Sequence, residues 1–104
     1  MNRDLLDDFI KHLENLLEQG NQSEYVRDAK GIYLKVEYMN NLIAEARELI
    51  QYGELEIALE NMLENLSEVS IFIDEDTANL AKQAFGGKTS VGIEEIINSL
   101  VKKY

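Results

Sequence analysis

The sequence contains no cysteine. This absence excludes disulfide bonds, thiolate metal sites and thiol nucleophiles. Small secreted domains commonly depend on disulfides for stability, whereas the cytosol keeps thiols reduced. We therefore expect a cytoplasmic protein.

Histidine is almost absent too, because His12 is the only one. Neither a multi-histidine metal site nor a di-iron bundle with paired Glu-x-x-His motifs can be assembled from it. We expect His12 to be a solvated helix residue. We also expect no metal, no other cofactor and no catalytic residue, because the sequence has no Gly-x-Ser-x-Gly elbow and paired acids such as Glu56 and Glu60 on a helix are usually solvated.

Two short motifs fall short of known ligand sites. Gly87-Lys88-Thr89 resembles the end of a phosphate-binding loop, but Lys82 stands where that loop needs its first glycine. A calcium loop starting at Asp74 would need glycine at its sixth position, where Asn79 stands. Both motifs are better explained without a ligand.

Long apolar runs are missing as well. No uncharged stretch approaches the roughly 20 residues that span a bilayer. Residues 1–8 include acids where an export signal would need an apolar run of roughly 7 to 15 residues. We expect neither a membrane segment nor an export signal.

Proline is also absent, and apolar residues recur at spacings of three and four. Both features are typical of helices. With 104 residues, the chain has the size of one small domain. We predict an all-α fold, a single-domain bundle of about five helices over residues 1–104.

The first predicted helix covers residues 3–18. Its apolar stripe consists of Leu5, Leu6, Phe9, Ile10, Leu13, Leu16 and Leu17. Gly20 is expected to end it in a left-handed conformation. Asn21 and Glu24 then resemble a capping box for the next element.

The longest predicted helix covers residues 32–52, with Gly53 as its stop. Its start is ambiguous, because apolar and polar residues alternate over residues 32–38 as they would in a short strand. We favour helix there, with a break near Gly31, and a strand remains the alternative.

Three further helices complete the prediction. One covers residues 54–67, another runs from an Asp74 cap to about residue 85 before Gly86-Gly87, and the last runs from a Ser90 cap to Tyr104. Lys102 and Lys103 would complement the dipole at the end of the last helix.

Basic residues are absent from residues 48–81, which carry nine acids. Helices commonly alternate Glu with Lys four residues apart for stability, and this segment forgoes every such pair. A solvated helix face is the alternative explanation for each acid. The residues predicted to bind a partner are Glu54, Glu56, Glu60, Glu64, Asp74, Glu75 and Asp76.

An acidic surface repels nucleic acid and anionic lipid and attracts a basic protein, and the whole chain has a net charge of −10. Nucleases are basic where they hold phosphates, so an acidic protein that covers such a groove inhibits them. Aromatic anchors rank second as interface candidates. They are Tyr25, Tyr33, Tyr38 and Tyr52.

Residues 45–86 resemble the MafI-type immunity proteins, which protect bacteria from polymorphic or contact-dependent growth inhibition toxins. The resemblance lies in the helix that ends at Gly53-Glu54, the segment Ala58-Leu59-Glu60-Asn61-Met62-Leu63, and Ile71-Phe72-Ile73 followed by Asp74-Glu75-Asp76. It implies a small cytosolic helical protein that binds a cognate toxin, often a nuclease, with no catalytic residues.

We therefore predict an immunity protein that neutralises a basic toxin domain. It is expected to bind neither nucleic acid nor membrane itself. The alternative is a helical adapter or regulator, and an enzyme ranks third. The sequence leaves the oligomeric state open, because an uncovered apolar face around Ile57 or residues 71–73 could pair two copies.

Overall fold

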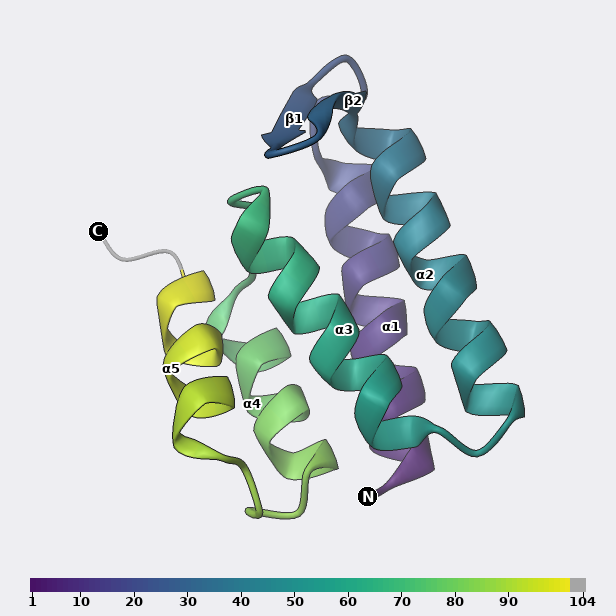
Figure 1. Ribbon diagram of the computed structural model, residues 1–104, viewed down its shortest axis with the longest axis vertical. Coiled ribbons are helices and arrows are strands. Elements are labelled where there is room, and N and C mark those ends of the chain that lie inside the picture. The colour runs from purple at the N-terminus through teal and green to yellow at the C-terminus, as the bar shows by residue number, and fades with distance from the viewer. Residues whose placement is uncertain (102–104) are drawn as a thin grey trace.

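The computed structural model describes residues 1–101 as five helices and one β-hairpin (Figure 1). In chain order the elements are α1 (Arg3–Gln19), β1 (Tyr25–Asp28), β2 (Gly31–Leu34), α2 (Lys35–Gln51), α3 (Leu55–Glu68), α4 (Glu75–Ala84) and α5 (Val91–Leu100). The predicted helical bundle is confirmed in outline. The prediction of a purely α-helical chain is wrong, because the fold includes two paired strands.

The helices form two layers (Figure 1). In one layer α3 packs between α2 and α5, and in the layer behind it α1 packs against α4. The buried apolar side chains form a single cluster. Every helix contributes to this cluster, because each carries apolar residues at spacings of three and four.

The first helix begins and ends close to the predicted residues. Asn2 caps α1, and its Oδ1 accepts a hydrogen bond from the backbone N–H of Leu5 at 3.1 Å. Gly20 follows the helix, but its φ of −85° is not left-handed, contrary to our expectation. Its N–H donates to the Leu17 carbonyl, which closes the last turn without a left-handed residue.

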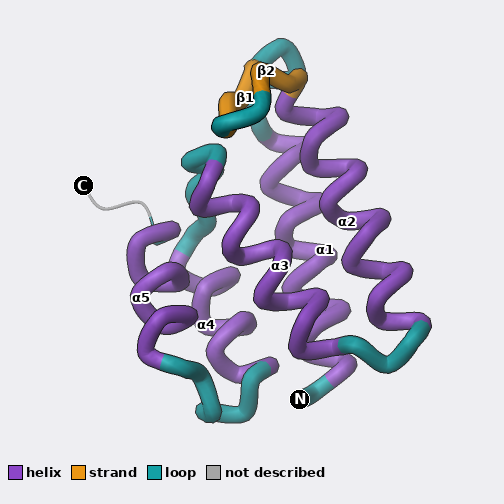
Figure 2. The backbone as a smooth tube through the Cα atoms, viewed as in Figure 1, coloured by secondary structure: helices purple, strands orange, loops and turns teal. Residues whose placement is uncertain are grey.

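The β-hairpin stands where we predicted a capping box at Asn21 and Glu24 and the start of the helix over residues 32–52. Asn21 and Glu24 do not form a capping box, and Asn21 Oδ1 instead accepts from the N–H of Ser23 in a local turn. Strands β1 and β2 pair antiparallel from Tyr25 opposite Leu34 to Asp28 opposite Gly31. The strand alternative for residues 32–38 is thus correct as far as Leu34. Figure 2 shows the hairpin at one end of the molecule, where it joins α1 to α2.

Helix α2 begins at Lys35 and ends at Gln51, followed by the predicted stop at Gly53. Gly53 has a φ of +77°, a left-handed conformation that favours glycine. The N–H of Gly53 donates to the Ile50 carbonyl, and that of Glu54 donates to the Leu49 carbonyl. This turn reverses the chain and sets α3 beside α2.

The two short helices start at their predicted caps, Asp74 and Ser90. Helix α5 ends at Leu100, earlier than predicted, because Val101 is extended and forms a parallel bridge with Ile73. The Leu100 carbonyl accepts the N–H of Ile73 at 2.9 Å. The expected continuation to Tyr104, with Lys102 and Lys103, lies outside the described residues.

Candidate functional site

The predicted acidic residues of α3 form a row along its exposed side. Glu54 is the residue before the helix and makes no side-chain capping bond. Glu56, Glu60 and Glu64 follow at one residue per turn, while the opposite side of the helix is buried. In a straight helix each step of four residues drifts by about 40° around the axis, so the row slants across the exposed surface.

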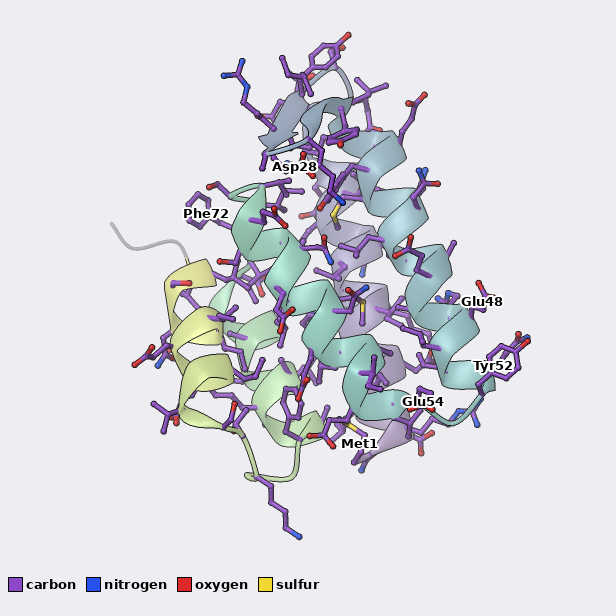
Figure 3. The ribbon with its side chains drawn as sticks, viewed as in Figure 1. Met1, Asp28, Glu48, Tyr52, Glu54 and Phe72 are labelled. Carbon is purple, nitrogen blue, oxygen red and sulfur yellow. The ribbon has the colours of Figure 1, made fainter. Side chains whose placement is uncertain are left out.

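Glu68 extends this row by one more step of four residues, and it is also exposed. It was not among the predicted site residues, although its spacing from Glu64 was visible in the sequence. In Figure 3, Glu54 lies at the end of the molecule near Met1, whereas Asp28 and Phe72 lie toward the opposite end. We name Glu56, Glu60, Glu64 and Glu68 the α3 acidic row.

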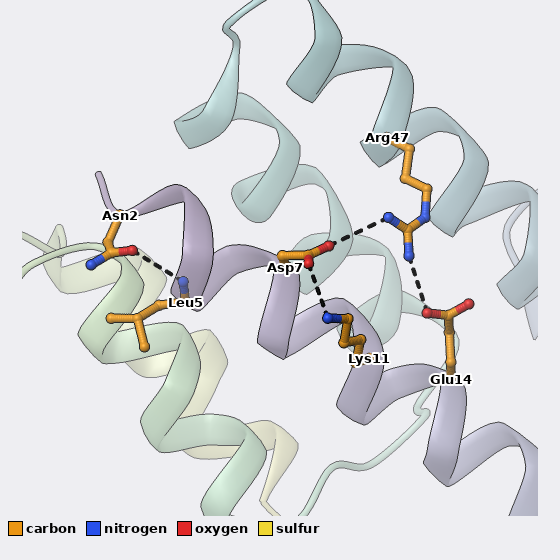
Figure 4. A network of polar contacts seen from close by, with 6 residues as sticks. All are labelled: Asn2, Leu5, Asp7, Lys11, Glu14 and Arg47. Atoms are coloured by element: carbon orange, nitrogen blue, oxygen red, sulfur yellow. Dashed lines mark hydrogen bonds and ion pairs between the residues drawn. The ribbon is translucent and has the colours of Figure 1, made fainter.

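No member of the α3 acidic row forms an ion pair within residues 1–101. The ion pairs of this part of the chain lie elsewhere. Arg47 of α2 reaches two carboxylates of α1, Asp7 at 3.5 Å and Glu14 at 3.1 Å, and Lys11 also pairs with Asp7 (Figure 4). Asp7 and Glu14 of α1 thus have cation partners within the fold, whereas the α3 acidic row has none within residues 1–101.

Glu60 has the least favourable environment in the row. Partial burial, followed by the neighbouring carboxylates of Glu56 and Glu64, raises the pKa of Glu60 above its ordinary value. The ionised side chain is therefore less favourable in the folded protein than in an unfolded chain. A cation supplied by a partner would offset this repulsion.

The acids of α4 lie in the other helix layer and do not join the α3 acidic row (Figure 1). Glu75 and Asp76 are exposed in the first turn of α4, where they also complement the helix dipole. Asp74 has an internal role, because its Oδ1 accepts the N–H of Thr77 at 2.8 Å and the Thr77 hydroxyl. The seven predicted residues thus fall into two groups.

His12 is half-buried and not the solvated residue we expected, because α4 packs over this side of α1. Its Nδ1 lies 3.2 Å from Oγ1 of the fully buried Thr77. Since the Thr77 hydroxyl donates to Asp74, it accepts from Nδ1–H of His12. The hydroxyl stands between the imidazole and the carboxylate, which is not the order of a catalytic triad. The hydrogen bonds among these three side chains instead link α1 to the first turn of α4.

Acid-dependent stability is expected from Asp74. The hydrogen bond from the Thr77 hydroxyl is the main cause that lowers the pKa of Asp74 below 3.8, and nearby His12 adds to it while burial opposes it. A lowered folded-state pKa contributes stability above pH 3.8, and this contribution is lost as the pH falls through the folded-state value. Asp74→Asn keeps an acceptor oxygen and removes the charge, so it should cost about 1 kcal/mol at neutral pH.

Thermal unfolding of both proteins from pH 7 to pH 2.5 measures this effect. The difference between wild type and Asp74→Asn should shrink below about pH 4. Glu95→Gln serves as the control, because Glu95 is exposed and its side chain accepts no hydrogen bond within residues 1–101. A wild-type advantage that stays constant over the whole pH range would contradict the assigned role.

Residues 1–101 lack two common kinds of functional feature, a metal site and a membrane-spanning helix. No three His, Asp or Glu side chains come together as a metal site there. None of the helices in this part of the chain is long and apolar enough to cross a membrane. Of the apolar residues that could pair two copies, Ile57 and Phe72 are exposed, whereas Ile71 and Ile73 are buried.

The structure thus defines a small two-layer helical protein with one hairpin and an acidic row on α3. No protein-family model, curated protein or solved structure matches the chain.

Proposed function

We propose that this chain is a cytoplasmic immunity protein that binds a cognate bacterial toxin domain, a basic nuclease, and covers its active site or substrate groove. The observation that carries the proposal is the α3 acidic row, whose carboxylates have no cation partner within residues 1–101. From Glu56 to Glu68 the row extends over about 18 Å of helix.

Such a row suits competition with nucleic acid. A nuclease groove is basic because it must hold phosphates, and its basic residues displace the counterions condensed on the nucleic acid when the two bind. Carboxylates fixed on a helix approach the same positions and steer the two proteins together. Burial, and then repulsion from Glu56 and Glu64, raises the pKa of Glu60, and lysine or arginine residues of the partner would offset the repulsion.

Capture of the partner tests this proposal directly. Tagged protein is used as bait in extracts of the native bacterium at low salt, bound proteins are eluted with increasing salt, and they are identified by mass spectrometry. We expect a basic toxin domain that is released as the salt rises, because the exposed charges are screened. Recovery of only regulatory or metabolic proteins would contradict immunity and favour the helical adapter.

A further inference from the structure

A groove of about 440 Å³ lies between the hairpin, α2 and α3. Residues far apart in the sequence meet there, from Asp28 in β1 to Asn65 in α3. The hairpin side contributes Tyr33, and α2 contributes Glu37, Tyr38 and Glu45. None of these residues was among the primary candidates of the sequence analysis.

Two tyrosines form an aromatic wall of this groove. The ring centroids of Tyr33 and Tyr38 lie 5.5 Å apart with a tilt of 42°. Tyr38 is held in place, because its hydroxyl donates to Asn65 Oδ1 at 3.1 Å and Asn65 Nδ2 donates to the Asn61 carbonyl at 2.7 Å. Burial, followed by the charge of Asp28, raises the pKa of both phenols, so both are neutral at pH 7. Both rings are therefore uncharged, and the Tyr38 ring is held in position by Asn65.

The charges around the aromatic wall are mostly negative. The groove is lined by the carboxylates of Asp28, Glu37 and Glu45 and by one ammonium group, that of Lys30. Glu37 and Glu45 are eight residues apart on α2, so they lie about 12 Å apart along the helix axis. Neither Glu37 nor Glu45 forms an ion pair within residues 1–101.

We propose that this groove receives an arginine side chain of the partner protein. A guanidinium is planar, stacks on aromatic faces and donates hydrogen bonds in its own plane. Stacked on Tyr33 or Tyr38, it would donate to the carboxylates of Glu37 or Glu45 on either side. A lysine ammonium satisfies the charge but cannot stack in the same manner.

The groove continues the α3 acidic row. Asn65 of α3 lines the groove, and Glu68, the last member of the row, follows Asn65 by three residues, less than one turn of the same helix. A basic partner that lies along α3 would therefore reach the groove at one end. The arginine site rests on the proposed function, because the groove would bind an arginine of the same basic partner that contacts the α3 acidic row.

A peptide titration tests the groove without the toxin. The isotopically labelled protein is titrated by NMR with blocked Gly-Arg-Gly, with Gly-Lys-Gly, and with the uncharged Gly-citrulline-Gly. We expect the largest shifts at the rings of Tyr33 and Tyr38 and at the side-chain amides of Asn41 and Asn65. The arginine peptide should bind more tightly than the lysine peptide, and the citrulline peptide should have little effect.

Matched variants identify the carboxylates. Replacement of Glu37 and Glu45 by Gln should weaken arginine binding about fivefold or more, whereas the same replacement at the exposed residues Glu94 and Glu95 should leave it unchanged. Lys30→Ala removes a competing cation from the groove and should tighten binding. Equal losses in the two double variants, or shifts spread evenly over the acidic surface, would overturn the groove proposal.

The two proposals fail independently. A groove that does not bind the arginine peptide leaves immunity to be decided by partner capture. Capture of a partner that is not a toxin would contradict immunity, while a positive titration would still establish an arginine-binding groove in that other complex.

Discussion

Replacement of Glu56, Glu60 and Glu64 by lysine is expected to slow association with the proposed toxin partner by about 10- to 100-fold at low salt. The three substitutions reverse most of the α3 acidic row, so the partner's basic surface would be repelled where it is now attracted. The effect should fall as salt rises, because these residues are at the surface. Stopped-flow mixing of the purified proteins at several salt concentrations measures the rate.

The control must change the net charge equally without touching α3. Asp8, Glu18 and Glu95 are exposed on other helices and form no ion pair within residues 1–101, so their replacement by lysine is a matched triple variant. It should slow association much less, and circular dichroism should show that both variants keep their helices. Equal slowing would mean that only the net charge matters, and an unchanged rate in the α3 variant would remove this helix from the interface.

The helices could be predicted because each is amphipathic with the same period. In α3 the spacing of three and four predicts Ala58, Leu59 and Met62 as buried, and all three are. The stops were also visible, since Gly53 and the Gly86-Gly87 pair adopt positive φ. Gly20 was different, because a glycine at a helix end permits a left-handed residue but does not require one.

The hairpin was missed because its strands are only four residues long and the second strand, β2, continues directly into α2. The turn itself has a sequence signal, with aspartate first and glycine fourth, as type I turns prefer. Asp28 Oδ1 accepts the N–H groups of Lys30 and Gly31. The helical spacing of Leu34, Tyr38, Leu42, Ala46 and Leu49 favours a helix that begins before Lys35.

The candidate site also has one part that local sequence predicts and another part that only the fold brings together. The α3 acidic row follows from spacing within a single helix, so the sequence predicts most of it. The bond between His12 and Thr77 joins residues 65 positions apart, and the groove joins three elements, so neither could be found before the fold was known. For Asp74, the sequence predicts the capping role but not the second hydrogen bond, which its carboxylate accepts from the Thr77 hydroxyl.

Phe9→Ala is expected to lower the free energy of unfolding by about 3 to 5 kcal/mol. Phe9 is fully buried on α1 within the core cluster, so truncation removes apolar contacts and leaves a cavity. Domains of this size commonly have a total stability of about 5 to 15 kcal/mol. The melting temperature should therefore fall by about 12 °C or more. Urea unfolding followed by circular dichroism measures the free energy.

Phe72→Ala is the matched control, because Phe72 is the same residue type but is 53% exposed (Figure 3). Its truncation should cost less than about 1 kcal/mol, since much of the ring already contacts water. Comparable losses at both positions would contradict the assignment of Phe9 to the core. If Phe72→Ala leaves stability intact and weakens binding of the proposed toxin partner, the exposed ring belongs to the surface that this partner contacts. That surface would then extend from the α3 acidic row to the loop that follows it.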